Sequence, residues 1–246
     1  MTTADPAPRR ALVTGGSGDI GSAVCRALAA DGRAVIVHAN SGLDRAEALA
    51  ATLRAAGADA RAVAFDVADP EATGAALARL LEDGPIPIVV NNAGIHDDAP
   101  MAGMSPAQWH RVIDVSLHGF FNVTQPLLLP MARARFGRIV SVSSVAAVLG
   151  NRGQTNYAAA KAALHGASKS LAREMGSRGV TVNVVAPGII AGRMTEGGFT
   201  PEQVKAMVPA ARAGTPEEVA AVVRFLCSDA AGYVNGQVIG VNGGMG

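Results

Sequence analysis

A buried strand that leads directly into a glycine turn and then a helix is the feature that most limits how this chain can fold. The strand is Ala11-Leu12-Val13-Thr14, the turn is Gly15-Gly16-Ser17-Gly18-Asp19-Ile20-Gly21, and a helical pattern continues from Ser22 to Ala30. Glycines in such a turn let the backbone approach a diphosphate closely, and the amides at the helix N-terminus receive its charge. The spacing matches the dinucleotide-binding fingerprint, and the strand and helix on either side give the match its weight.

The rest of the chain alternates strand-like and helix-like segments. Strands are expected near residues 10–14, 34–38, 60–65, 87–91, 137–142, 180–185 and 237–241. Helices are expected near residues 20–31, 44–56, 69–82, 105–135 with a break, 156–177 and 216–228. This alternation predicts an α/β fold: a doubly wound parallel sheet (Rossmann fold) of about seven strands with helices on both faces. Ligands bind such sheets beyond the carboxyl ends of the strands.

Length, charge and cysteine content restrict the class of protein further. The 246 residues suit one domain over residues 10–246 after a flexible lead over residues 1–9. A formal net charge of +1 gives no basic surface for nucleic acid, and Cys25 and Cys227 fit no metal or disulfide pattern. The uncharged stretch 115–132 contains prolines and polar residues, which favours an interface helix over a membrane span. Because the first residues do not form a signal peptide, we expect a cytoplasmic protein that binds neither nucleic acid nor membrane.

Tyr157 and Lys161 are the main candidates for acid–base chemistry. Their spacing of four residues puts a phenol and an ammonium on one helix face. A free tyrosine titrates near pH ~10, and we expect the lysine charge to lower that pKa towards working pH. Ser144, after a strand-like segment, offers a hydroxyl that can hold a carbonyl oxygen. The alternative is an ordinary exposed Tyr–Lys pair in an alanine-rich helix.

Several motifs taken together resemble those of the short-chain dehydrogenase/reductase family. They are the glycine turn after Thr14, Asn91-Asn92-Ala93-Gly94, Ser144, Tyr157-Ala158-Ala159-Ala160-Lys161 and Asn183-Val184-Val185-Ala186-Pro187-Gly188. The resemblance covers essentially the whole chain. Within the family, residues 153–156, 168–174 and 236–245 are most similar to those of the 3-oxoacyl-[acyl-carrier-protein] reductases.

This resemblance implies an oxidoreductase that uses NADP(H). It would reduce a 3-oxoacyl thioester, linked to acyl-carrier protein, in fatty-acid or specialised polyketide-like synthesis. Ser144 and Tyr157 would stabilise the oxyanion, Tyr157 would supply the proton, and Lys161 would hold the nicotinamide ribose. Ser116 stands where the family has a catalytic asparagine that holds a water of the proton relay. We expect the serine hydroxyl to preserve that relay with altered geometry.

The residues after the second predicted strand favour NADP over NAD. Ala39, Asn40 and Ser41 supply no carboxylate for the ribose hydroxyls of NAD, and Arg45 is near in sequence. Gly18 replaces an arginine that many NADP-dependent relatives carry, so the expected preference is modest. The residues expected to bind the cofactor are Gly15, Ser17, Gly18, Asp19, Ile20, Gly21, Asn40, Ser41, Asp66, Val67, Asn92, Ala93, Gly94, Tyr157, Lys161, Pro187, Gly188 and Ile190.

Three of these expectations involve alternatives or departures from the family pattern. Asp66 and Val67 are expected at the adenine, whereas the alternative is a helix N-cap for the segment that starts at Asp69. Asp19 stands where related reductases usually have a glycine, and its carboxylate should weaken diphosphate binding unless it caps the helix or faces solvent. Gly192 replaces the usual threonine, which removes one cofactor contact.

Partners are also implied by the resemblance. Arg135 and Arg178 align with the arginines that dock the acidic carrier protein, the alternative being ordinary surface charge. Pairing of the apolar segment 115–135 and of the helix after Tyr157 predicts a homo-oligomer, a tetramer in the resembling reductases. Residues 196–207 are expected to form a mobile lid. We expect no metal site, because His96-Asp97-Asp98 lies in a loop after Gly94, where polar residues are expected in any case.

Two other functions remain open from the sequence. One is a reductase or dehydrogenase of acyl-CoA, a steroid, a sugar or another small alcohol or ketone. The other is a non-catalytic, cofactor-binding partner subunit, against which the presence of Ser144, Tyr157 and Lys161 argues.

Overall fold

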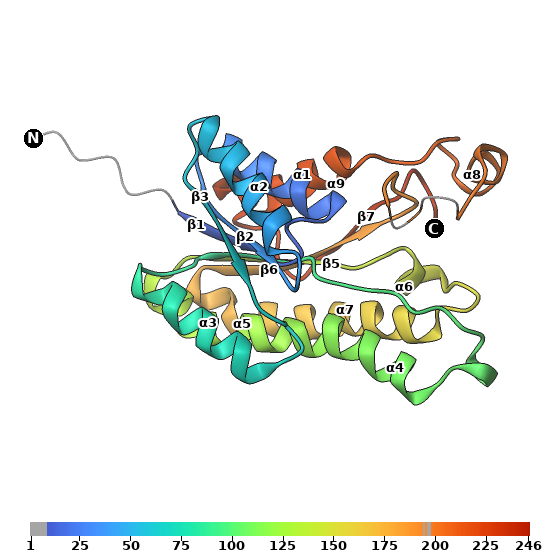
Figure 1. Ribbon diagram of the computed structural model, residues 1–246, viewed down its shortest axis with the longest axis horizontal. Helices are drawn as coiled ribbons and strands as arrows, with labels where there is room; N and C mark the ends of the chain where they lie inside the picture. Colours follow the sequence, from blue (N-terminus) through green and yellow to red (C-terminus); the bar gives the residue numbers. More distant parts are fainter. Residues whose placement is uncertain (1–8, 194, 196–197) are drawn as a thin grey trace, which may run out of the picture.

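Seven parallel strands form the single sheet of the computed structural model, which describes residues 9–193, 195 and 198–246 (Figure 1). Their order across the sheet is β3-β2-β1-β4-β5-β6-β7. The strands are β1 (Arg10–Val13), β2 (Ala34–Ala39), β3 (Ala60–Ala64), β4 (Ile88–Asn91), β5 (Gly137–Val142), β6 (Val180–Pro187) and β7 (Val238–Val241). Each predicted strand agrees with the observed one to within two residues, and the predicted fold class is confirmed.

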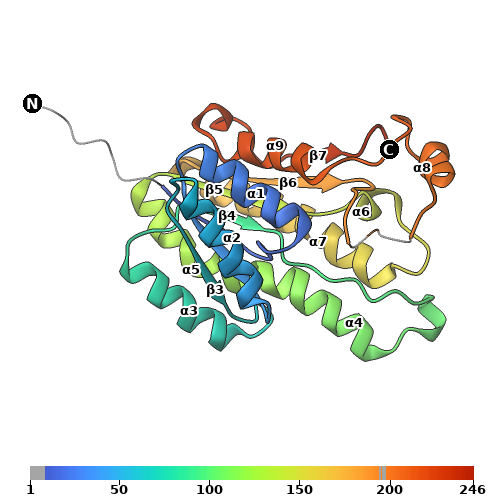
Figure 2. The same cartoon turned by 45° about the horizontal axis from the view of Figure 1, so that its top comes forward.

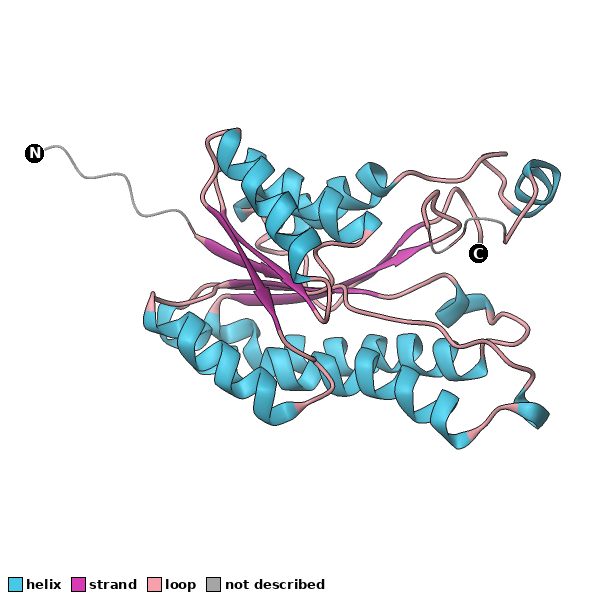
Figure 3. Cartoon of the chain, viewed as in Figure 1, coloured by secondary structure: helices cyan, strands magenta, loops and turns pink. Residues whose placement is uncertain are grey.

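The central strands are apolar on both faces because helices cover the sheet on both sides (Figure 3). Successive side chains enter different cores: Val13 packs in one cluster and Leu12 in the other. One face carries α1 (Asp19–Ala30), α2 (Leu43–Ala55) and α9 (Pro216–Leu226). The other carries α3 (Pro70–Glu82), α5 (Gly119–Ala134) and α7 (Thr155–Met175). Figure 2 shows the two helical layers from a second direction.

The break predicted within residues 105–135 is a π-helical turn. Helix α4 (Pro106–Ile113) leads into η2 (Asp114–His118), a single π turn, and α5 continues from Gly119. A π turn widens the helix locally, and such turns are frequent at functional sites. Ser116 lies in the middle of this turn and is buried.

Short elements complete the chain. They are α6 (Ala146–Leu149), α8 (Pro201–Met207) and the 3₁₀ turns η1 (Met101–Gly103), η3 (Gly176–Arg178) and η4 (Asp229–Ala231). Helix α6 was not expected from the sequence, because four residues are too few to show a helical period. Among the helices of the described residues, none is long and apolar enough to cross a bilayer.

The predicted flexible lead needs one revision. Residues 1–8 lie outside the described residues, but Arg9 is part of the folded domain. Its guanidinium pairs with Asp229 at 2.6 Å and lies over the Phe136 ring, 3.8 Å from the centroid. These contacts to residues far along the chain hold the start of β1 against the domain.

Candidate active site

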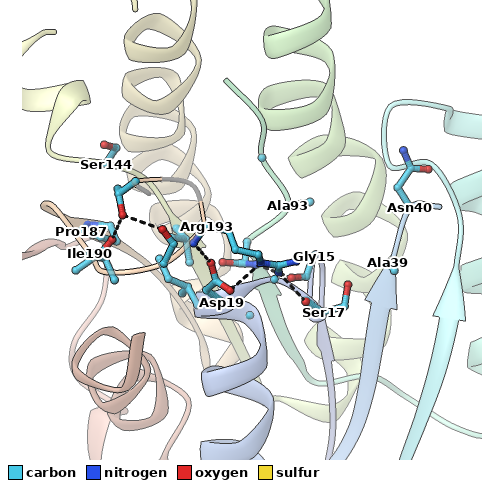
Figure 4. Close-up of a pocket in the computed structure, with 18 of the residues that line it drawn as sticks. Gly15, Ser17, Asp19, Ala39, Asn40, Ala93, Ser144, Pro187, Ile190 and Arg193 are labelled. Carbon is cyan, nitrogen blue, oxygen red and sulfur yellow. Dashed lines mark hydrogen bonds and ion pairs between the residues drawn. The ribbon is translucent and has the colours of Figure 1, made fainter. Parts of the chain in front are cut away.

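A cleft of about 330 Å³ opens where the carboxyl ends of β1, β2, β4, β5 and β6 meet (Figure 4). It brings together most of the residues predicted from the sequence. These are Gly15, Ser17, Gly18, Asp19, Ile20, Gly21, Asn40, Ser41, Asn92, Ala93, Gly94, Ser144, Tyr157, Lys161, Pro187, Gly188 and Ile190. Ser116, Asp66, Val67, Arg135 and Arg178 are not among the lining residues.

The glycine turn is shaped for close approach of a ligand. Gly15 has a φ of +61°, a backbone conformation that other residues rarely adopt. A side chain at Gly21 would collide with the turn, because its Cβ would lie 2.2 Å from the Gly15 carbonyl oxygen. The turn therefore presents backbone at the N-terminus of α1, and this fits the diphosphate of a dinucleotide.

Thr14 and Asn92 fasten the glycine turn to the end of β4. The Thr14 hydroxyl accepts hydrogen bonds from the amides of Asn92 and Ala93, both at 3.0 Å. The Asn92 side chain donates back to the carbonyl oxygens of Thr14 and Gly15, at 2.9 and 3.1 Å. Two neighbouring strand ends thus form one rigid wall of the cleft.

His38 is a supporting residue that the sequence reasoning missed. It is fully buried at the end of β2, its Nδ1 accepts from the Gly15 amide at 3.2 Å, and its Nε2 donates to the Phe65 carbonyl oxygen at 2.9 Å. Burial lowers the pKa of His38 to about 4, so the ring is neutral and keeps the tautomer that both bonds require. A lone histidine in an apolar strand gave no sequence signal for this role.

Tyr157 keeps its proton in this site. Burial raises the pKa of its phenol above the usual 10, and the Ser144 hydroxyl beside it works in the opposite direction. The expected lowering by Lys161 is wrong for this arrangement. The Lys161 Nζ lies 5.7 Å from the centre of the Tyr157 ring, and desolvation of the phenolate outweighs an attraction over that distance.

Lys161 is itself strongly affected by burial. Its side chain is 3% exposed, its Nζ donates to the Val142 carbonyl oxygen at 2.9 Å, and desolvation lowers its pKa to about 8. A lysine with this pKa readily loses and regains a proton near neutral pH, which suits a group that transfers protons.

Asn156 positions the start of α7 and was not identified from the sequence as a supporting residue. It is fully buried, its side-chain oxygen accepts from the Tyr157 amide at 2.8 Å, and its Nδ2 donates to the carbonyl oxygens of Asp97 and Gln108 at 3.0 and 3.1 Å. Tyr157 is therefore fixed relative to α4 and to the loop after β4.

Ser116 lies behind the cleft wall, near Lys161. Its buried Oγ makes no hydrogen bond to any described residue. Gly94 separates the two side chains: a Cβ there would lie 2.9 Å from the Lys161 Nζ and 3.8 Å from the Ser116 Oγ. The absence of a side chain at Gly94 keeps this space open between the hydroxyl and the ammonium.

Asp66 and Val67 take structural contacts. The Asp66 carboxylate accepts from the Ala68 amide at 2.9 Å, and Val67 is buried against Gly119 in α5. Asp69, and not Asp66, caps α3, through the amides of Glu71 and Ala72. The expected contact of this pair with adenine stays a prediction.

The end of β2 forms the outer wall of the cleft. Ala39, Asn40, Ser41 and Arg45 line it, and the described part of this wall has no carboxylate. The Arg45 guanidinium lies against Gly42, where a Cβ would be 2.8 Å from its Nη2. A positive charge thus stands beside the place that a ribose would take after this strand.

Arg135 and Arg178 lie together but away from the cleft. Arg135 has a φ of +50° at the end of α5, and its Nη2 donates to the Ser177 carbonyl oxygen at 3.1 Å, one residue before Arg178. Arg135 lies just before the start of β5, and Arg178 lies just before the start of β6. Because the strands are parallel, both arginines lie at the amino ends of the strands, whereas the catalytic residues of the same chain lie at the carboxyl ends.

Two remaining predictions concern loops. Glu196 and Gly197 of the expected lid lie outside the described residues; Phe199 and Val204, in the rest of it, line a hollow beside the cleft. His96 and Asp98 form a pair at 3.3 Å, and within the described residues no three His, Cys, Asp or Glu side chains converge as a metal site would require.

Known proteins with similar sequences and folds indicate the family of this chain. A family model described as "Enoyl-(Acyl carrier protein) reductase" matches residues 16–246. A 3-oxoacyl-[acyl-carrier-protein] reductase of Aggregatibacter actinomycetemcomitans is 43% identical over 95% of this chain and 98% of its own length. One of Escherichia coli K12 is 43% identical over 96% of both chains.

A solved structure has the same fold over nearly its whole length. It is provisionally named a gluconate dehydrogenase of Agrobacterium tumefaciens, with 35% identity, a TM-score of 0.93 and coverage of 96% of this chain and 95% of its own. The glycine turn, Ser144, Tyr157 and Lys161 line one cleft. Together with these similarities, this arrangement identifies a nicotinamide-dependent oxidoreductase. The chain belongs to the short-chain dehydrogenase/reductase family.

Proposed function

We propose that this chain reduces the ketone of a 3-oxoacyl thioester linked to acyl-carrier protein, with NADPH as the reductant, in the cytoplasm. The observation that carries the proposal is the shared cleft: Ser144, Tyr157 and Lys161 line the same space as the glycine turn. The full-length similarity to 3-oxoacyl-[acyl-carrier-protein] reductases supports the substrate class.

The chain's own residues provide the oxyanion site and the proton. A bound nicotinamide supplies the hydride. The Ser144 hydroxyl and the Tyr157 phenol both donate hydrogen bonds to the carbonyl oxygen, and the negative charge that develops there is stabilised by these preorganised donors. Because burial raises the pKa of Tyr157, the phenol carries its proton at neutral pH and can transfer it to the alkoxide.

Lys161 and Ser116 restore that proton. The ammonium lies on the same face of α7 as Tyr157, and the Ser116 hydroxyl is free of hydrogen bonds to the described residues across the gap left by Gly94. A hydroxyl can both accept and donate a proton, so it can take the asparagine's place in a relay from Lys161.

Charge at the end of β2 supports the choice of NADPH. Asn40, Ser41 and Arg45 offer hydrogen-bond donors and one cation to a 2′-phosphate. A carboxylate at this place, which would repel the phosphate, does not occur in the described wall.

The positions of Arg135 and Arg178 link carrier docking to assembly. Helix α5 also exposes Phe121 and Leu129, at 62% and 67%. If α5 and α7 pair across a two-fold axis, the helices run antiparallel, and the Arg135 end of one subunit lies beside the catalytic end of its partner. We therefore propose that the carrier protein docks on the arginines of one subunit and delivers its acyl group to another, within a tetramer.

One specific observation favours a second candidate, a dehydrogenase of sugar-like alcohols. The solved structure with a TM-score of 0.93 bears the provisional name of a gluconate dehydrogenase. The same catalytic residues can oxidise an alcohol by the reverse reaction, so the substrate has to be determined by experiment.

Steady-state rates decide between these functions. NADPH oxidation would be measured with a 3-oxoacyl carrier protein, the matching 3-oxoacyl-CoA, a free ketone and an enoyl thioester, and NADP reduction with gluconate. We expect the highest kcat/KM for the carrier-linked ketone and loss of activity in Tyr157→Phe. A higher value for gluconate would favour the second candidate, and no turnover with any substrate would indicate a non-catalytic partner subunit.

A further inference from the structure

Asp19 and Arg193 join two walls of the cofactor cleft (Figure 4). Asp19 is the first residue of α1, and Arg193 follows β6 in the loop across the cleft, 174 residues later. The Arg193 amide donates to the Asp19 Oδ2 at 2.7 Å, and its Nε donates to Oδ1 at 3.1 Å. Backbone and side chain of one arginine thus hold both oxygens of one carboxylate.

Gly192 makes room for this arrangement. A Cβ at Gly192 would lie 2.6 Å from the Asp19 Oδ2, so a side chain there would displace the carboxylate. The observed position of the Asp19 carboxylate therefore requires the glycine at position 192. Arg193 supplies the charge that compensates the aspartate.

The loop holds the backbone of Arg193 while its guanidinium remains accessible. The Ala191 amide donates to the Gly214 carbonyl oxygen at 2.8 Å, and the Thr195 hydroxyl donates to the Ile190 carbonyl oxygen at 2.6 Å. The Arg193 side chain is 56% exposed, and its Nη2 lies 3.4 Å from the Ser17 carbonyl oxygen in the glycine turn.

The charges around Arg193 favour a transfer of its guanidinium from the Asp19 carboxylate to a bound phosphate. The Asp19 carboxylate lies beside the amides that bind a diphosphate in Rossmann sheets, and a second anion there is repelled by it. A guanidinium stays charged at all working pH values and pairs with phosphate oxygens through two parallel hydrogen bonds. The Arg193 guanidinium contacts both the Asp19 carboxylate and the glycine turn at Ser17.

We propose that Arg193 binds the diphosphate of the cofactor and that Asp19 holds the guanidinium ready for it. On binding, the guanidinium passes from the carboxylate to the diphosphate. Arg193 then favours cofactor binding directly, whereas Asp19 opposes it. This inference rests on the proposed use of a nicotinamide dinucleotide in the same cleft.

Binding of ADP and of adenosine tests the proposal without turnover, because only ADP carries the diphosphate. Calorimetry on Arg193→Ala should give an ADP dissociation constant raised about tenfold, with adenosine binding unchanged. Asp19→Asn keeps the shape of the side chain and should bind ADP more tightly than the unmodified protein. Thermal melting confirms that each variant is folded.

The double variant separates direct binding from a structural role. If Arg193 contacts the diphosphate, adding Arg193→Ala to Asp19→Asn should again weaken ADP binding about tenfold. If Arg193 only compensates Asp19, the double variant will bind ADP like Asp19→Asn, and the proposal is overturned. An equal loss of ADP and adenosine binding in Arg193→Ala also overturns it.

Arg224→Ala is the matched control, because Arg224 also pairs with an aspartate of the α1 region, Asp31, through Nε at 2.8 Å. This pair lies at the far end of α1, so ADP binding should be unchanged. Failure of the proposed function would give a different result: the unmodified protein would bind ADP and NADPH but would reduce no ketone. In that case the role of Arg193 in diphosphate binding stands.

Discussion

The Lys161 ammonium donates its hydrogen bond to the Val142 carbonyl oxygen, at 2.9 Å, from a fully buried position. This contact places the cation against the end of β5, 5.7 Å from the centre of the Tyr157 ring. Burial removes the ammonium from water, and this desolvation lowers the pKa of Lys161.

The pH dependence of reduction should report Lys161. Its pKa of about 8 means that the ammonium loses its proton as the pH rises past that value. Since kcat/KM reports groups of the free enzyme, it should decline with an apparent pKa near 8 while Tyr157 is still protonated. In Lys161→Arg the residual activity should show no such decline, because a guanidinium keeps its charge. A profile that stays flat to pH 10 in the unmodified enzyme contradicts this role.

His38 should make folding stability depend on pH. Its pKa falls from 6.5 in the unfolded chain to about 4 in the fold, so the unfolded state binds more protons between these values. The contribution of His38 to stability is complete above pH 6.5, falls as the pH drops from 6.5 to 4, and should be lower by up to about 3 kcal/mol below pH 4.

Urea unfolding at several pH values measures this effect. His38→Asn should be less stable at neutral pH and should lose the slope between pH 4 and 6.5. The exposed His110 provides the control, since His110→Asn should keep the slope of the unmodified protein. An unchanged slope in His38→Asn would assign the pH dependence to other groups.

Ser116 should matter for turnover and not for cofactor affinity. Ser116→Ala should lower kcat about tenfold or more, because the hydroxyl opposite Lys161 is lost from the relay. Ser116→Asn should remain active. Ser168→Ala is a matched control. The Ser168 Oγ is also buried and without a hydrogen-bond partner among the described residues, but Ser168 lies in α7, beyond Lys161. Equal kcat for Ser116→Ala and the unmodified enzyme at all pH values would make Ser116 structural.

A carboxylate at the end of β2 should reverse the cofactor preference. Ala39→Asp should weaken NADPH binding about tenfold or more and strengthen NADH binding, through repulsion of the 2′-phosphate. Because Ala39 is buried, Asn40→Asp serves as a second variant that keeps the size of an exposed side chain. Titration that gives equal or tighter binding of NADH by the unmodified protein would reject the NADP assignment.

Arg135 and Arg178 should affect only carrier-linked substrates. Charge reversal at either should raise KM for the carrier-bound ketone, and added salt should remove part of the difference. A small ketone should be reduced at an unchanged rate, and Arg79→Glu on the surface of α3 should affect neither substrate. Equal losses with both substrates would indicate a role in folding. Light scattering that gives a monomer at micromolar concentration would contradict delivery between subunits.

Local pattern determined most of the framework of this protein. Strand and helix bounds were predictable because apolar periodicity reflects burial on one face or two, and the glycine turn was recognisable because its backbone tolerates little else. The residues that meet in the cleft followed from the rule that parallel strands end at one edge. Ser144, which follows β5, is an example. Tyr157 and Lys161 were recognised instead from their spacing of four residues and from the family motif that they match.

Contacts between distant segments were decided by the tertiary structure alone. The sequence spacing of Tyr157 and Lys161 predicted a lowered tyrosine pKa, but burial raises it, because desolvation depends on everything packed around the phenol. His38 acquires its role from Gly15 and Phe65, and Asp19 from an arginine across the cleft. Such pairings leave no local periodicity in the sequence, since they depend on how strands and loops far apart in the chain are brought together.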